Sequence, residues 1–148
     1  MRSRLTLVVA IVAWIGVGAA AASRPPAAGH GPDNQVKDTW KIPAGADAEK
    51  SPLTLSPAVI AAGQKLFVGK CQRCHGKQAK GNGPDAEPEH EKDMDLTVAA
   101  RADKNPDGVV FYRIWNGRTS PKMPAFSKEL SKEQAWALVA YVQTLRAK

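Results

Sequence analysis

Cys71-Gln72-Arg73-Cys74-His75 is the stretch of this 148-residue chain that decides its fold, and it contains the chain's only two cysteines. A separation of three positions places the two thiols on one face of a helical turn. The histidine follows directly. Because no third thiol exists, neither a disulfide to another part of the chain nor a four-cysteine cluster can form. Both thiols and the imidazole are therefore candidates for holding one shared group.

The Cys-x-x-Cys-His pattern is typical of the attachment of c-type haem. Two thiols at this spacing can add to the two vinyl groups of the porphyrin, and His75 can then meet the iron. Two other interpretations compete. A thioredoxin-like motif accompanies a βαβ pattern, which this sequence lacks. A structural zinc site needs four ligands, whereas the only other histidines are His30 and His90. The sequence therefore predicts one covalently bound haem c.

Residues 1–22 have the composition of a secretory signal peptide. Two arginines precede an apolar run over residues 5–18, and small residues at 19–22 offer an Ala-x-Ala cleavage site. The run is short for a membrane span, although residues 16–22 would lengthen it into an uncleaved anchor. Haem is attached to such motifs outside the cytoplasmic membrane. We therefore expect a periplasmic protein, without stable membrane insertion unless the signal stays uncleaved.

Charge is distributed unevenly along the chain. The formal net charge is +7, and it becomes +5 once the two arginines of the signal peptide are removed. Residues 85–95 hold six acidic side chains against Lys92, a local charge of −5, so the rest of the mature chain carries +10. Such segregation predicts an oriented encounter with a charged partner. An ordinary solvated acidic loop on a basic protein is the alternative.

Residues 23–52 are predicted to be a linker. Their first part is rich in proline, alanine and glycine and has no apolar period, which is typical of disorder. Trp40 and Ile42 stand out, because apolar side chains in a polar tail usually find a surface to cover. We expect the segment around Trp40 to dock on the folded domain.

Three helices are expected after the linker. Ser56-Pro57 predicts the start of the first, with a capping residue before a first-turn proline. Asn105-Pro106 and Asn116-Gly117 frame the second. Residues 131–134 form a capping box at the start of the third. No alternating strand pattern competes, so the expected fold is all-α with long loops.

From about Leu53 to Arg146 the sequence resembles the class I cytochromes c. Gly63-x-x-x-Phe67-x-x-x-Cys71 is similar to the family's first helix. Leu138-Val139-Ala140-Tyr141-Val142 is similar to its last helix, and Lys122-Met123-Pro124-Ala125-Phe126 to the loop that carries the second axial ligand. The resemblance implies a small cytochrome c fold at residues 53–148, with three main helices and long loops around one covalently bound haem.

The resemblance also implies roles for single residues. Cys71 and Cys74 would be the thioether anchors of the haem. His75 would be the proximal ligand of the iron and Met123 the distal ligand. A thioether is a soft ligand that favours ferrous iron, so His/Met ligation raises the reduction potential relative to two histidines.

Two of these roles have competitors. The far ring nitrogen of His75 would be held by the carbonyl of Pro84, with Pro88 as the alternative. Met94 competes with Met123 for the distal position, but it lies among acidic residues, whereas a distal ligand needs an apolar wall that keeps water from the iron. Met123 as an ordinary core residue is a further alternative.

Basic side chains near these motifs bear on binding partners. Arg113 and Arg118 suit pairing with the haem propionates, and a solvated arginine is an equal alternative for each. Six lysines lie near the anchor or the ligand loop and would steer an acidic redox partner: Lys65, Lys70, Lys77, Lys80, Lys122 and Lys128. Nucleic-acid binding is not expected of an exported haem protein.

The sequence thus predicts a monomeric periplasmic carrier of one electron. Both axial positions of its iron would be filled, so it would not be an enzyme by itself. The alternative is a haem c subunit of a larger oxidoreductase, which accepts electrons from a catalytic partner. A haem enzyme or gas sensor with an open sixth position would require that Met123 does not bind the iron.

Overall fold

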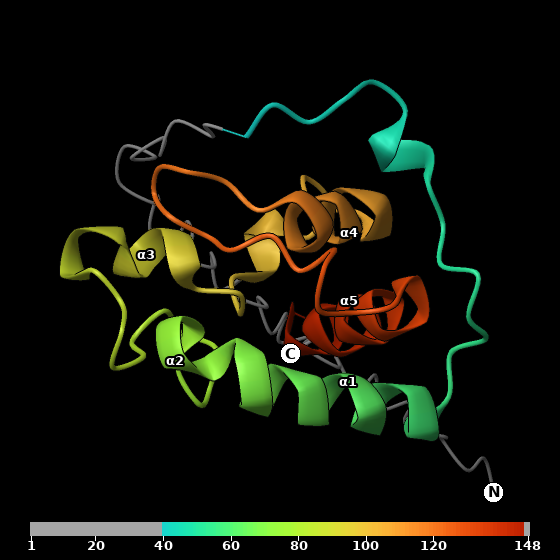
Figure 1. Ribbon diagram of the computed structural model, residues 1–148, viewed down its shortest axis with the longest axis horizontal. Coiled ribbons are helices and arrows are strands. Elements are labelled where there is room, and N and C mark those ends of the chain that lie inside the picture. Colours follow the sequence, from blue (N-terminus) through green and yellow to red (C-terminus); the bar gives the residue numbers. More distant parts are fainter. Residues whose placement is uncertain (1–39, 147–148) are drawn as a thin grey trace, which may run out of the picture. The chain divides into compact units, whose positions relative to one another are not determined.

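A computed structural model describes residues 40–146 of the chain (Figure 1). By their contacts these residues belong to one unit, Gln35–Lys148. The predicted signal peptide at residues 1–22 and residues 23–39 of the predicted linker lie outside the described residues. In the described part the structure is helical and has no strands, as predicted. No helix in that part is both long enough and apolar enough to cross a membrane.

Helices of very different lengths make up the described chain. The α-helices are α1 (Pro57–Lys70), α2 (Gln72–His75), α3 (Glu91–Met94), α4 (Asp107–Asn116) and α5 (Lys132–Arg146). Short 3-10 helices are η1 (Ala46–Ala48), η2 (Pro88–His90) and η3 (Ala99–Arg101). The three long helices α1, α4 and α5 are the three that the sequence predicts, and long loops connect them.

Local capping explains where the long helices begin. Ser56 precedes α1, and its hydroxyl accepts a hydrogen bond from the backbone N–H of Val59 at 3.3 Å. Pro106 precedes α4. Before α5, the backbone N–H of Ser131 donates to Oε1 of Gln134 at 2.9 Å, and the backbone N–H of Gln134 donates to Oγ of Ser131 at 3.2 Å. These bonds satisfy N–H groups that a helix start otherwise leaves without partners.

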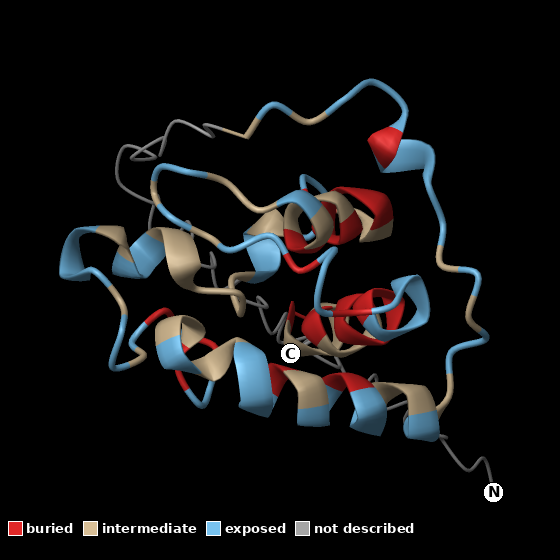
Figure 2. Cartoon of the chain, viewed as in Figure 1, coloured by how far each residue is buried: buried red, intermediate tan, exposed pale blue. Residues whose placement is uncertain are grey.

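The core lies where α1 and α4 pack on α5 (Figure 2). Helices α1 and α5 lie side by side (Figure 1) and approach closely at Gly63, where an added Cβ would sit 2.0 Å from the carbonyl oxygen of Ala137. Phe67, Leu138 and Val139 are fully buried at this crossing. Burying side chains of this size contributes roughly 1.5–3 kcal/mol each.

Residues 40–49, which we call the strap, lie against α4. Ala46 of η1 is buried, and the start of α4 accommodates it through Gly108. A Cβ at Gly108 would meet the carbonyl oxygen of Ala46 at 1.9 Å, so only glycine allows this approach. The predicted docking segment around Trp40 is therefore in contact with the helical domain.

The loop after α2 folds back on the Cys71–His75 motif. Backbone N–H groups of residues 81, 83 and 85 donate to the carbonyls of residues 75, 74 and 73, at 2.8, 3.1 and 2.8 Å. Further along, the N–H of Leu96 donates to the carbonyl of Ala79 at 2.8 Å. These bonds bring the acidic segment and α3 against the motif, although both come later in the chain.

Candidate functional site

A cavity of about 1070 Å³, including space open to solvent, brings the predicted site residues together. Its lining includes Cys71, Cys74, His75 and Met123, the four residues predicted to hold a haem and its iron. Pro84 is not part of the lining.

The walls of this cavity are mostly apolar because three helices turn apolar faces toward it. Phe67 comes from α1, Val110 and Ile114 from α4, and Leu138 and Val142 from α5. Each pair on α4 and α5 is separated by four positions and so occupies one face of its helix. A planar apolar group would be shielded from water between these walls.

The two thiols lie on the single turn formed by the end of α1 and by α2. Both are free and partly buried. Burial raises the pKa of Cys71 to about 12, and burial, followed by the nearby Asp85 charge, also raises the pKa of Cys74. Redox-active cysteines have lowered pKa values instead. The environment therefore argues against a thioredoxin-like site.

His75 is oriented by a backbone carbonyl. Its Nδ1 lies 2.7 Å from the carbonyl oxygen of Met94. Burial lowers the pKa of His75, the Met94 bond opposes that shift, and the charge of Arg118 adds to it. The neutral ring must donate through Nδ1, because a carbonyl can only accept. The lone pair of Nε2 is then left for a metal.

The carbonyl that holds His75 differs from the predicted one, which was that of Pro84 or, alternatively, Pro88. Next to Pro84, the backbone N–H of Asp85 donates to the carbonyl of Arg73 at 2.8 Å, and Nη2 of Arg73 donates to the Asp85 carboxylate at 2.9 Å. The carbonyl that meets Nδ1 of His75 comes from ten residues after Pro84, at Met94. The prediction of Pro84 is therefore corrected to the backbone of Met94.

Met123 is positioned by a short backbone pairing. Its N–H donates to the carbonyl of Arg118 at 2.9 Å, and the N–H of Arg118 donates back at 2.8 Å. Gly117 has φ +59°, and a Cβ there would meet the Met123 carbonyl oxygen at 2.4 Å. The N–H of Phe126 anchors the other end of the loop to the Ile114 carbonyl at 3.1 Å. The loop thus holds Met123 at the cavity.

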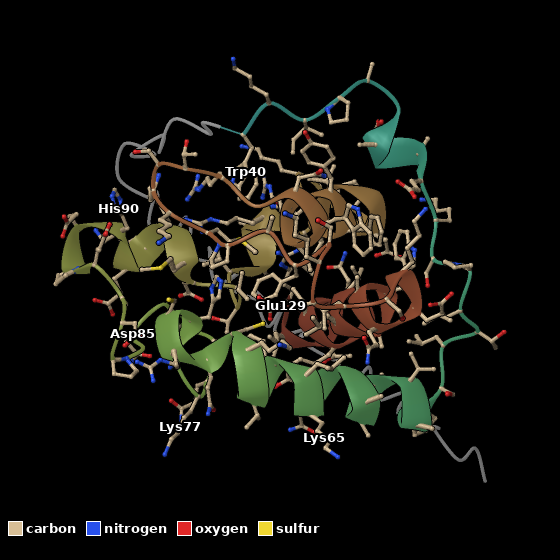
Figure 3. The ribbon with its side chains drawn as sticks, viewed as in Figure 1. Trp40, Lys65, Lys77, Asp85, His90 and Glu129 are labelled. Carbon is tan, nitrogen blue, oxygen red and sulfur yellow. The ribbon has the colours of Figure 1, made fainter. Side chains whose placement is uncertain are left out.

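The other methionine and histidines that the sequence offers near the motif or in the tail are placed differently. Met94, the competitor of Met123, also lines the cavity, but its backbone is fixed on the His75 side. His90 does not line the cavity; it lies at the outer end of α3 (Figure 3) and pairs there with Glu87 at 3.5 Å. His30 lies outside the described residues.

Trp40 and two arginines lie together at the cavity. The guanidinium carbons of Arg113 and Arg118 are 5.4 and 4.9 Å from the centre of the Trp40 ring. All three residues are part of the cavity lining. Cations at these distances over an indole ring form cation–π interactions, so the strap is bound to the arginines as well as to α4.

A third arginine, Arg146, also lines the cavity. It donates to the backbone carbonyls of Leu96 and Asn105 at 3.3 and 3.2 Å, and Asn105 also accepts from Arg113. Burial lowers the pKa of Arg146, and the charges of Arg113 and Arg101 add to this. Several fixed positive charges thus lie along one cavity, where they suit the two carboxylates of a haem.

The residues present therefore fit a covalently held haem. The cavity brings together both thiols, His75 and Met123, the four residues for which roles at the haem are predicted from the sequence. The sequence did not reveal every residue of the cavity. It missed the Met94 carbonyl and Arg146, for which no motif exists. The isolated tryptophan in a polar segment led to the prediction that Trp40 docks on the domain. It did not indicate that Trp40 lines the cavity.

The chain is similar to known proteins in two comparisons. The family model described as Cytochrome c matches residues 60–146, more than half of the chain. One similar structure is a chain of the Kuenenia stuttgartiensis reducing HAO-like protein complex Kustc0457/Kustc0458, with a TM-score of 0.56 and 32% sequence identity. The match covers 65% of this chain and 47% of the Kuenenia chain. The KustC0563 c-type cytochrome has a TM-score of 0.46 and 26% sequence identity, and the match covers 57% of this chain and 96% of that cytochrome. No curated protein matches. This chain thus spans about half of the Kuenenia complex chain.

Proposed function

The chain belongs to the cytochrome c family, and from that membership we propose that it is an exported carrier of one electron on a single haem c. The family places the chain among haem proteins of electron transport, with the haem bound covalently. Our proposal adds the single haem of a class I domain, axial ligation by His75 and Met123, a periplasmic location and the absence of an enzyme activity of its own.

One observation supports the proposed ligation above all others. His75 and Met123 line the same cavity as the two thiols, although Met123 comes from a different loop. His75 presents Nε2 as a lone pair because Nδ1 is engaged by Met94. With both axial positions filled, a substrate or gas would find no open site on the metal.

The chain's own residues would adapt the bound haem to electron transfer. The haem supplies an iron that takes up and releases one electron. The Met123 thioether favours the ferrous state, and the Met94 carbonyl fixes the ring of His75 and raises its basicity. Apolar walls such as Phe67 and Leu138 exclude water, which disfavours the extra positive charge of the ferric state.

Optical spectra of the purified holoprotein in both redox states test this proposal. We expect haem that stays with the polypeptide after denaturation, a low-spin spectrum in both states, and in the oxidised state the weak far-red band associated with iron–sulfur ligation. The reduced protein should not bind carbon monoxide at neutral pH. Carbon monoxide binding by the unmodified protein would show an open sixth position and favour a sensor or enzyme.

We further propose that an acidic redox partner docks on the basic part of the domain. Lys65 and Lys77 are exposed and point away from the helices (Figure 3), whereas Lys70 is paired with Glu129 at 2.7 Å. Electron transfer to the partner should slow as salt rises, because the Debye length falls from about 30 Å at 0.01 M to about 3 Å at 1 M. A rate independent of ionic strength would favour the solvated-surface alternative.

A second candidate function is that of a haem c subunit in a larger oxidoreductase. It is favoured by the similarity to a chain of an HAO-like complex, at 32% identity. In that case the protein would accept electrons from a catalytic partner. Light scattering on natively purified protein separates the two functions: a monomer mass supports the free carrier, and a stoichiometric assembly with a second polypeptide supports the subunit.

A further inference from the structure

We propose that Trp40 is a positioning residue, whose ring holds Arg113 and Arg118 at the haem cavity so that their charges stabilise the reduced haem. The inference rests on the proposed function, because it requires haem in the cavity. It concerns a residue that lies outside the region matched by the family, which begins at residue 60.

The contacts place the indole against both guanidinium groups at the cavity. Arg118 is 4.9 Å and Arg113 5.4 Å from the ring centre, and Trp40 is half-buried. The arginines come from different segments, one from α4 and the other from the loop that holds Met123. A single ring thus connects the wall of the cavity to the loop of the distal ligand.

The position of Trp40 is itself fixed by α4. The strap makes a turn in which the N–H of Ala46 donates to the carbonyl of Pro43 at 3.2 Å, and Ala46 is seated against Gly108. Because Gly108 and Arg113 belong to the same helix, the strap's anchor and one of the cations move together. This geometry gives the ring a defined place over the arginines.

The charges of the two arginines should raise the midpoint potential of the haem. A positive charge near the iron favours the reduced state, which carries one positive charge fewer, and this effect is strong where water is excluded. The guanidinium of Arg113 also donates to the side chain of Asn105, whereas the pairing with Met123 fixes the backbone of Arg118. Losing the ring would weaken the hold on the guanidinium groups, that of Arg118 above all, and their movement toward water would lower the midpoint potential.

Two replacements of Trp40 separate the role of its aromatic face from that of its bulk. Trp40→Phe keeps a ring over the cations, whereas Trp40→Leu keeps an apolar side chain without one. We expect the full-length holoprotein to have a nearly unchanged midpoint potential with phenylalanine and a lower one with leucine. If the leucine variant does not accumulate, Trp40→Met provides the same comparison.

A double-mutant cycle tests whether Trp40 acts through the arginine. In the Arg118→Gln background the shift caused by Trp40→Leu should shrink, because one of the two cations that the ring positions is gone. Ile42→Ala is the matched control within the strap; it removes apolar bulk that does not line the cavity, so it should lower thermal stability without moving the potential.

The inference is overturned if the leucine variant keeps the wild-type potential, if phenylalanine and leucine lower it equally, or if the leucine shift is undiminished in the Arg118→Gln background. These outcomes differ from failure of the proposed function, which would appear in the unmodified protein as an absence of covalent haem or of a reversible one-electron transition.

Discussion

The two sides of the haem cavity are built in different ways. On the His75 side, three successive carbonyls of the motif accept bonds from the following loop, and a fourth backbone group, the carbonyl of Met94, holds the imidazole. On the opposite side, Met123 depends on one backbone pair with Arg118 and on the anchor at Phe126. The His75 side is a closed network next to the two thiols proposed to attach the haem, whereas the Met123 side is one loop that should be able to change without releasing the cofactor. Substitutions on the two sides should therefore differ in kind.

The largest effect is expected at the covalent attachment. Cys74→Ala removes one thioether and disturbs the turn that presents His75, so holoprotein should be lost or severely reduced. Haem staining of denatured protein, normalised to the amount of polypeptide, measures this. Normal yields of stained protein would contradict the role of Cys74 as an anchor of the haem, and with it the rigid role given to this side of the cavity.

Met123→Ala should leave the haem attached but change its chemistry. Without the soft thioether donor the midpoint potential should drop by tenths of a volt, since axial ligands move haem potentials over roughly 0.8 V. The reduced form should then bind carbon monoxide. Redox titration and carbon monoxide difference spectra measure both changes.

Met94→Ala is the matched control for this prediction. It removes the side chain but keeps the carbonyl that orients His75, so the oxidised spectrum should retain the far-red band of iron–sulfur ligation. If Met94→Ala loses that band and Met123→Ala keeps it, the distal ligand is Met94 of the acidic segment and not Met123.

An intermediate effect is expected where the loop packs behind His75. Gly81 has φ +82°, and a Cβ there would sit 2.0 Å from the carbonyl oxygen of Glu91 and 3.1 Å from the N of Asp95. Gly81→Ala should therefore lower the free energy of unfolding by about 1–3 kcal/mol and also move the potential, because Met94 lies between the displaced groups.

Gly69→Ala is the control, measured in the same denaturant titration. Nothing lies within 4 Å of a Cβ at this exposed position of α1, so alanine should stabilise the protein by about 0.5–1 kcal/mol through its better helix propensity. Equal destabilisation by both alanines would mean that the close backbone contacts of Gly81 do not cause the loss of stability.

The smallest effect is expected at the outer ion pair of Arg73 and Asp85. Both groups are exposed, and Arg73 lowers the pKa of Asp85 mainly through their hydrogen bond. Because the pKa of Asp85 is lower in the folded than in the unfolded protein, its carboxylate stabilises the fold at pH values above the unfolded-state pKa, about 3.9. This stabilisation is lost as the pH falls through the folded-state pKa. Arg73→Gln should thus lower the Tm only slightly at neutral pH, and by less as the pH falls through the folded pKa of Asp85, as measured by thermal melts over a series of pH values.

Features with local causes were the ones predictable from the sequence. The capping signals at Ser56 and at residues 131–134 depend on bonds spanning three positions, so sequence reading located the helix starts. The Met94 carbonyl could not be found in this way, because every residue has a carbonyl and its place depends on how closely the loop approaches at Gly81. Arg146 is held at the cavity by the backbone carbonyls of Leu96 and Asn105, 50 and 41 positions away in the sequence, and no local pattern reveals such contacts.

The seating of Ala46 on Gly108 has a practical consequence for choosing fragments of this protein. A boundary taken from the family match would start at residue 60, and one taken from the sequence would start at residue 53; both remove the strap. Such a fragment would keep every residue of the Cys71–His75 motif and still lack one wall of its cavity. Potentials measured on it would describe a different electrostatic environment, so the minimal functional piece begins before Trp40.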